Sequence, residues 1–246
     1  MDFKTLFQGF NDKKVLIVGD AMIDAYMWGE VNRMSPEAPV PVVEVKKHEN
    51  RLGGAANVAL NLKALGANPI LCSVVGTGNR GVLFKKLMEE SKLSTAGILS
   101  TNKRKTTIKT RVIAENKHQL RIDEEETFPI LETEEFLNLA ISLMNDIDVI
   151  ILQDYNKGVL TDEIIEGLIA TANKKGIPTI VDPKKLNFNS YKNCTIFKPN
   201  LAEIKAGMKI DFDANSITEI KKATAKLREQ LSAKGVLLTL SERGIC

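Results

Sequence analysis

Short apolar runs alternate along the chain with longer stretches in which apolar residues recur at helical spacing. The short runs show no polar alternation, which is typical of strands covered on both faces. They lie at 14–19, 69–75, 148–153, 178–182, 194–199 and 236–240. The amphipathic stretches lie at 55–65, 82–90, 133–144, 162–174 and 216–233. This order predicts an α/β fold, a doubly wound and mostly parallel sheet with helices on both faces.

Two regions depart from this alternation. Residues 39–45, and residues 106–114 together with 118–123, alternate polar and apolar positions, and no helix separates the last two. Such patterns predict a small antiparallel β flap with one wet face. Because a flap beside the carboxyl ends of parallel strands can exclude water from a site there, we expect it to act as a lid.

Composition narrows the class of protein. The 246 residues are 43% hydrophobic and 26% charged, close to the globular average. The net charge is +3, and the basic residues are scattered along the chain without forming a block. We therefore expect no nucleic-acid partner and, without an apolar stretch of about 18 residues, no membrane partner. Three separated cysteines and two histidines provide neither a disulfide framework nor a zinc site. A reducing, cytoplasmic location is expected.

The motif Gly76-Thr-Gly78-Asn-Arg-Gly81 matches the G-x-G-x-x-G pattern of dinucleotide-binding loops. That pattern also requires an acidic residue about 20 positions later to bind the ribose hydroxyls. Residues 91–114 contain no acid. The glycines are therefore better explained by a tight turn, and a dinucleotide-dependent oxidoreductase stays as the weaker alternative.

Acidic side chains follow several predicted strands. Asp20 and Asp24 come after the first strand, and Asp154 and Asp182 end two later ones. Since open α/β sheets bind ligands at the carboxyl ends of their strands, these acids predict one polar cleft suited to sugar hydroxyls. Asp20 could instead cap a turn, and Asp24 could be a solvated surface charge.

Gly53 and Gly54 open a helix that carries Asn57 in its first turn. Two glycines there let backbone amides approach a ligand, or let the helix start pack tightly. Further along, Asn200 and Glu203 have capping-box spacing, or would hold water around a magnesium ion carried by nucleotide phosphates. The sequence leaves both pairs of alternatives open.

Four basic residues lie on the predicted flap and strand-end loops: Lys109, Arg111, Lys157 and Lys184. Together they would suit a phosphorylated substrate, although each alone could be a solvated surface charge.

Seven segments are informative in combination: GDAMIDAYMWGEVNRMSPEAPVPVVEV, GGAANVALNLKALGA, TTIKTRVIAENKHQLRIDEE, DYNKGVL, DPKK, KPNLAE and TLSERG. In this order they resemble the ribokinase-like (PfkB) carbohydrate kinases. Within that family they resemble the kinase domain of ADP-heptose synthases, a D-glycero-β-D-manno-heptose-7-phosphate kinase. The resemblance runs from about Val15 to Gly244, and MSPEAPVPVV is specific to the heptose branch. It implies one ribokinase-like kinase domain over 1–246, with lid segments at about 26–50 and 104–123.

The resemblance also implies roles for individual residues. Those matching the sugar and sugar-phosphate site are Asp20, Asp24, Gly53, Gly54, Asn57, Lys109, Arg111, Asp154 and Lys157. Those matching the ATP site are Lys184, Asn200, Glu203, Ser241 and Gly244, with Glu203 reaching Mg²⁺ through water. The implied reaction moves the γ-phosphoryl group of MgATP to the anomeric hydroxyl of heptose 7-phosphate, in ADP-heptose biosynthesis for the lipopolysaccharide core. The lid also offers a surface for a homodimer.

The chain departs from the family pattern at two places. Gly78 stands where the family commonly has an aspartate, which creates the dinucleotide-like motif. The sequence also reaches Cys246 before the Gly-Ala-Gly-Asp signature, which in the family supplies the catalytic base and an anion-binding helix N-terminus. We therefore expect an incomplete domain with almost no kinase activity. A non-catalytic protein that still binds the sugar phosphate is the second hypothesis.

Overall fold

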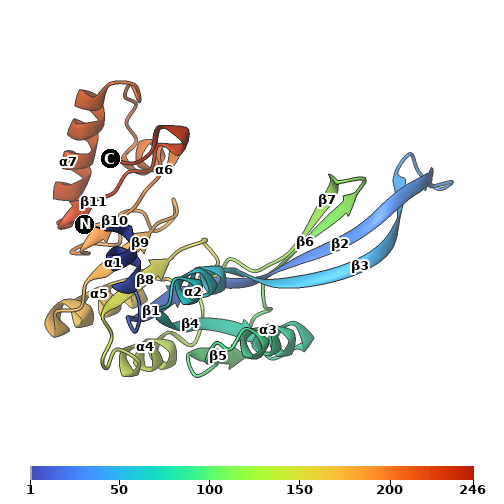
Figure 1. Cartoon of the computed structure of the whole chain (residues 1–246), viewed down its shortest axis with the longest axis horizontal. Coiled ribbons are helices and arrows are strands. Elements are labelled where there is room, and N and C mark those ends of the chain that lie inside the picture. The colour runs from blue at the N-terminus through green and yellow to red at the C-terminus, as the bar shows by residue number, and fades with distance from the viewer. Residues whose placement is uncertain (1) are drawn as a thin grey trace.

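The computed structural model describes residues 2–246 and contains a seven-stranded sheet (Figure 1). Its order is β11-β10-β9-β8-β1-β4-β5, and every pairing in it is parallel. The strands are β1 (Lys14–Gly19), β4 (Asn68–Gly76), β5 (Ile98–Thr101), β8 (Val149–Gln153), β9 (Thr179–Asp182), β10 (Ile196–Phe197) and β11 (Gly235–Val236). The predicted parallel sheet is confirmed, with β5 as a strand that the sequence pattern did not predict.

Helices cover both faces of this sheet. Val15 and Ile17 of β1 are buried in one cluster with residues of α2 and α3, whereas Leu16 and Val18 are buried in another with residues of α4 and α5. This explains why the strands are continuously apolar. The helices are α1 (Phe3–Gln8), α2 (Ala55–Ala64), α3 (Asn79–Glu90), α4 (Thr133–Ser142), α5 (Asp162–Lys175), α6 (Leu201–Met208) and α7 (Ile217–Leu231), with a 3₁₀ turn, η1 (Ser241–Arg243).

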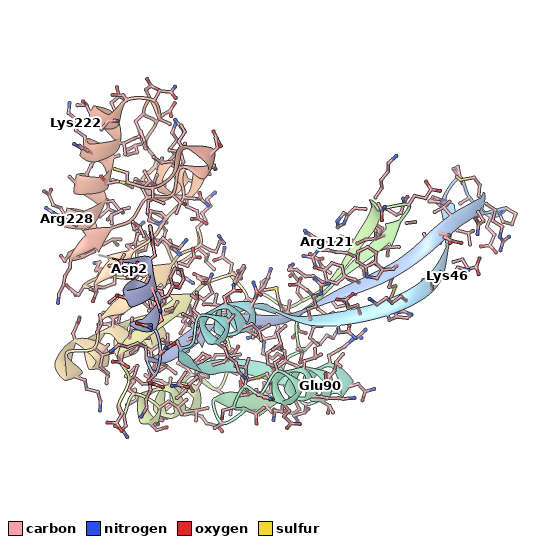
Figure 2. All side chains as sticks on the ribbon, in the orientation of Figure 1. Asp2, Lys46, Glu90, Arg121, Lys222 and Arg228 are labelled. Carbon is pink, nitrogen blue, oxygen red and sulfur yellow. The ribbon has the colours of Figure 1, made fainter. Side chains whose placement is uncertain are left out.

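A second sheet of four strands projects from the body (Figure 1). Its order is β3-β2-β6-β7, formed by β2 (Ala21–Met34), β3 (Pro41–Gly54), β6 (Ile108–Ala114) and β7 (Lys117–Glu124). In Figure 2, Lys46 and Arg121 lie on this projection, far from Glu90 at the end of α3. We call these four strands the flap sheet.

The flap sheet differs in one respect from the antiparallel flap that the sequence predicted. The β2–β3 and β6–β7 pairs are antiparallel, but β2 and β6 are parallel, so the sheet is mixed. The reason is that β2 and β6 both run outward from the body, each followed by its own returning partner. The sequence pattern detected β6 and β7 but missed β2, whose body end is buried on both faces.

Among residues 2–246 no helix is both long enough and apolar enough to cross a membrane.

The two histidines are exposed, and Cys72 and Cys194 are buried. Burial raises the pKa of each of these two thiols to about 12, so both are packing residues rather than nucleophiles.

Candidate functional site

Asp20 joins the end of β1 to the loop that follows β8. Its side chain is buried, and its carboxylate accepts hydrogen bonds from the backbone N–H groups of Tyr155 (2.8 Å), Lys157 (3.0 Å) and Val159 (3.0 Å). Burial raises the pKa of Asp20, against the three N–H donors that lower it. Its carbonyl oxygen accepts from the N–H of Ala55 at the start of α2 (3.0 Å). Asp20 therefore lies at the predicted site, where it positions two other segments.

Asp24 and Arg111 form an ion pair on one face of the flap sheet. An Arg111 Nη1 to Asp24 Oδ1 distance of 2.6 Å joins β6 to β2, and both side chains are 23% exposed. The guanidinium groups of Arg111 and Arg51 lie 5.4 Å and 5.0 Å from the centre of the Tyr26 ring. Trp28 stacks on Tyr26 with 6.1 Å between ring centres. The ion pair thus lies on an aromatic platform that can contact a ligand.

The two glycines that end β3, directly before α2, are required by packing. A Cβ atom on Gly53 would stand 2.3 Å from Asp24 Oδ2, and one on Gly54 would stand 2.4 Å from the Asp20 carbonyl oxygen. Gly54 also has φ +58°, a backbone conformation that favours glycine. The packing interpretation of the pair is confirmed. Asn57 is exposed on the first turn of α2, next to these glycines.

Lys109 of β6 and Lys157 of the loop after β8 meet at one carboxylate, Glu125. Lys109 Nζ lies 2.8 Å from Glu125 Oε2, and Lys157 Nζ lies 2.8 Å from Glu125 Oε1. Lys109 also bonds Asp123 at 2.9 Å. Burial alone would raise the pKa of Glu125, but its hydrogen bonds to the two lysines outweigh burial and lower it. The flap sheet and the body therefore meet at a charged bridge.

Asp154 uses its carboxylate within the protein. Its Oδ2 accepts from the Tyr191 hydroxyl (2.8 Å) and the Asn187 amide (3.0 Å), and its Oδ1 accepts from the N–H of Asn156 (2.7 Å). Burial raises the pKa of Tyr191 well above its usual value of 10, so its hydroxyl stays a donor. Asp154 thus fixes the turn that carries Lys157.

The residues predicted for the nucleotide gather at the start of α6. Asn200 and Glu203 form a complete capping box, with hydrogen bonds of 2.8 Å and 2.9 Å, which confirms the capping interpretation. Lys184 bonds the Glu203 carboxylate, and its ammonium lies 6.0 Å from the centre of the Tyr155 ring. Tyr155 therefore links this group to Asp20, because its backbone N–H donates to the Asp20 carboxylate.

Ser241 and Gly244 lie in the exposed turn around η1. Thr239, two residues before this turn, contacts the residues that directly precede α6. Its N–H donates to the carbonyl of Pro199 at 3.0 Å, and it forms a β-bridge with Asn200. The turn is therefore tethered beside the capping box through the backbone.

The structure thus brings the predicted residues together as two groups along the carboxyl edge of the parallel sheet. Sequence reasoning missed Glu125, Tyr155 and Arg104. Arg104 is buried, and its guanidinium donates to the carbonyl oxygens of Lys157 and of Glu126. Glu125 was hidden in the run Glu124-Glu125-Glu126, which is typical of a solvated loop.

Mg²⁺ fits this donor set only as an ion carried by nucleotide phosphates. Within residues 2–246 no group of three or more His, Cys, Asp or Glu side chains could hold a metal ion. Magnesium usually keeps several waters and takes phosphate oxygens as ligands, so a single nearby carboxylate such as Glu203 is sufficient. The residues present are therefore compatible with MgATP if phosphate oxygens and waters supply most of the ligands of the ion.

The dinucleotide-like motif has a packing explanation. A Cβ atom on Gly81 would stand 1.7 Å from the Gly76 carbonyl oxygen, because the start of α3 lies directly on the end of β4.

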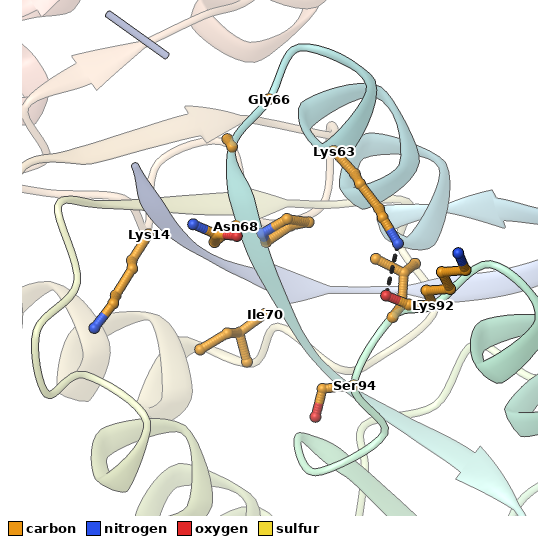
Figure 3. Close-up of a pocket in the computed structure, with 10 residues that line it drawn as sticks. Lys14, Lys63, Gly66, Asn68, Ile70, Lys92 and Ser94 are labelled. Carbon is orange, nitrogen blue, oxygen red and sulfur yellow. Dashed lines mark hydrogen bonds between the residues drawn. The ribbon is translucent and has the colours of Figure 1, made fainter. Parts of the chain in front are cut away.

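A hollow of about 510 Å³ lies at the amino ends of β1 and β4, at the opposite edge of the sheet from the candidate site (Figure 3). Its Lys63 ammonium already donates to the carbonyl of Lys92 (2.7 Å), as the dashed line in Figure 3 marks.

Comparison with known proteins gives concordant matches. The family model described as pfkB family carbohydrate kinase matches residues 12–246. The bifunctional protein HldE of Helicobacter pylori strain P12 is 40% identical over 235 residues, which are 95% of this chain and 50% of that protein. HldE of Desulfatibacillum aliphaticivorans is 42% identical over 240 residues, 96% of this chain and 48% of that protein. The chain spans about half the length of the curated relatives it matches.

Solved structures match the fold. The tetrameric inhibited form of phosphofructokinase-2 from Escherichia coli superposes with a TM-score of 0.75 at 17% identity, covering 95% of this chain and 75% of that one. Arabidopsis thaliana ribokinase complexed with ribose and ATP gives 0.67 at 17% identity, covering 95% and 74%. The expected ribokinase-like fold is therefore confirmed.

Proposed function

Because the chain belongs to the pfkB family of carbohydrate kinases, we propose that it is the sugar-kinase part of an enzyme acting on D-glycero-D-manno-heptose 7-phosphate. The γ-phosphoryl group of MgATP would pass to the anomeric hydroxyl, giving heptose 1,7-bisphosphate for ADP-heptose and the lipopolysaccharide core. The identity of 40% to HldE over 95% of the chain supports the heptose branch. This chemistry uses cytoplasmic ATP, so we place the protein in the cytoplasm.

The observation that carries the proposal is the convergence of Lys109 and Lys157 on one point. Two ammonium groups within 2.8 Å of one carboxylate form a site for an anion with several oxygens, such as the 7-phosphate. The neighbouring Asp24 and Arg111 offer an acceptor and a donor to sugar hydroxyls. Asp20 and Asp154 act by fixing the loop that carries Lys157.

The nucleotide would lie at the other group. Lys184 and the start of α6 would contact its phosphates, and the Ser241–Gly244 turn would line its pocket. Glu203 would lie near the Mg²⁺ ion carried by those phosphates, and that ion would supply charge neutralisation for the transfer. In such a transfer the protein residues mainly hold the two reactants in line and exclude water.

The catalytic base is a separate part of the proposal. The 246 residues contain no Gly-Ala-Gly-Asp sequence, and a positioned base contributes about 10²–10⁴ in rate. We propose that residues 1–246 by themselves bind the sugar phosphate with little turnover. Calorimetry with heptose 7-phosphate, beside an assay of ADP release from the same sample, tests this part.

We also propose that two copies associate through the flap sheet. Leu120 and Ile122 of β7 are 57% and 44% exposed and, two positions apart on one strand, share a face. Sedimentation analysis tests the idea: Leu120→Glu should convert a dimer into a monomer. A wild-type protein that sediments as a monomer at high concentration would refute it.

The main test is ADP release by the protein that carries this chain, with MgATP and a panel of sugars. We expect activity with heptose 7-phosphate, and at least tenfold less with fructose 6-phosphate or ribose. Lys109→Ala and Lys157→Ala should each raise KM for the sugar phosphate. A preference for fructose 6-phosphate would leave the family assignment intact and reject the heptose substrate.

A further inference from the structure

Glu125 links two parts of the protein that are far apart in the sequence. It follows β7 directly, at the base of the flap sheet, and its two oxygens bind ammonium groups from β6 and from the loop after β8. Each oxygen binds one lysine, Lys109 or Lys157, at 2.8 Å. The carboxylate thus occupies the one point on which both cations converge.

The chemistry of this position matches that of a phosphoryl group. A carboxylate presents two anionic oxygens on one atom, and a phosphate monoester presents pairs of oxygens in a similar arrangement with a larger charge. Side chains of both lysines are mostly buried, at 16% and 15% exposed, so an anion between them is screened less than one at the surface. Glu125 is itself 24% exposed and lies in the segment between β7 and α4, outside any helix or strand.

We propose that Glu125 holds the phosphate position when no ligand is bound, and that the phosphoryl group of the substrate displaces it. This inference rests on the proposed function, because it assumes that the two lysines bind the substrate phosphate. Glu125 then acts as an internal competitor. It keeps the flap sheet fastened to the body in the free protein, and it makes weakly charged anions poor ligands.

The neighbouring Asp123 provides a matched comparison. It bonds the same Lys109 at 2.9 Å, with its other oxygen 2.9 Å from Arg121, and it has no bond to Lys157. A general gain in positive potential would follow from neutralising either acid. Displacement from the bridging position predicts a large effect for Glu125 and a small one for Asp123.

The test is calorimetric titration of wild type, Glu125→Gln and Asp123→Asn with heptose 7-phosphate, inorganic phosphate and unphosphorylated heptose. Glu125→Gln should bind both phosphate ligands about fivefold to tenfold more tightly. Removing the one competing carboxylate from the two lysines should change the binding constant by about tenfold at most. Its affinity for unphosphorylated heptose should stay within twofold of wild type, and Asp123→Asn should change each affinity by less than about twofold.

The outcomes separate the two proposals. If wild type binds heptose 7-phosphate and Glu125→Gln binds it equally or more weakly, the displacement of Glu125 is refuted and the sugar-phosphate site stands. Equally tighter binding of phosphate ligands by Glu125→Gln and Asp123→Asn also refutes displacement, because it shows only a more positive electrostatic potential at the site. If neither wild type nor Glu125→Gln binds any phosphate ligand, while ATP still binds, the sugar-phosphate site and the displacement both fail. Circular dichroism of each variant confirms that the comparison is between folded proteins.

Discussion

Gly53 lies against Asp24 so closely that a methyl group on Gly53 would stand 2.3 Å from the Asp24 Oδ2 atom. The Asp24 carboxylate occupies the space that a side chain on Gly53 would need, and from there it bonds Arg111 at 2.6 Å. The glycine therefore shapes the candidate site by leaving room for an acidic side chain.

Gly53→Ala should displace the Asp24 carboxylate and break its ion pair with Arg111. We expect about tenfold weaker binding of the sugar phosphate and a loss of about 1 kcal/mol of unfolding free energy, because the nearest atoms belong to the end of the partly exposed Asp24 side chain, which can move aside. Calorimetry and urea denaturation measure the two effects. Gly78→Ala is the control, because a Cβ atom there meets nothing within 4 Å; it should cost no more than about 0.5 kcal/mol. Equal affinities for the two variants would contradict the role given to Gly53.

Asp20→Asn should destabilise the protein strongly. An amide has one acceptor oxygen where the carboxylate has two, so at least one of the N–H groups of Tyr155, Lys157 and Val159 would face a donor. We expect a loss of about 3 kcal/mol in urea denaturation, since a buried charged network is broken from one side. Asp146→Asn, at an exposed position, should leave stability unchanged. A loss at Asp20 below about 1 kcal/mol would show that the loop holds without it.

Acid should weaken the bridge between the flap sheet and the body. The pKa of Glu125 is lowered in the folded protein from its usual value of 4.5, chiefly by the two lysines acting against burial. Its stabilising contribution is therefore complete above pH 4.5 and is lost as the pH falls through the folded pKa. Denaturation of wild type and Glu125→Gln at several pH values measures this: the difference between them should shrink as the pH falls below 4.5. A difference that stays constant would contradict the bridge.

Asn200→Ala separates the capping role from a role at the nucleotide. Loss of the side-chain cap should cost about 1 kcal/mol of stability. Ser216→Ala is the matched control, because Ser216 caps α7 through the N–H of Glu219 at 3.3 Å and lies outside the candidate site. We expect similar destabilisation by both and weaker ATP binding by Asn200→Ala alone, measured by calorimetry. Unchanged ATP affinity in both would limit Asn200 to capping.

The parallel sheet could be predicted because its strands are covered on both faces and are therefore continuously apolar. The flap sheet was harder. β2 begins with buried residues on both faces and then becomes half-exposed. Neither a continuous apolar run nor a polar–apolar alternation therefore extends along its 14 residues. β5 has the sequence ILST, in which two apolar residues are followed by two polar ones, so it lacks the continuous apolar run that revealed the other short strands.

The candidate site was predictable where topology places residues. Asp20, Asp154 and Asn200 follow strands of one parallel sheet, so the fold alone brings them to one edge. Contacts between the flap sheet and the body were not predictable, because they depend on how two sheets meet. Glu125 belongs to this second class, as does the position of Tyr155 next to Lys184.

Trp28, the single tryptophan of the chain, stacks on Tyr26, and the Arg111 guanidinium lies 5.4 Å from the centre of the Tyr26 ring. Its indole Nε1 is buried without a hydrogen-bond partner among the described residues. The flap sheet thus contains a native optical probe, whose emission will change when the arginine or the surrounding strands shift. Ligand titrations and stopped-flow traces can therefore follow movement of the flap sheet by intrinsic fluorescence, with no dye attached and no other indole contributing to the signal from this chain.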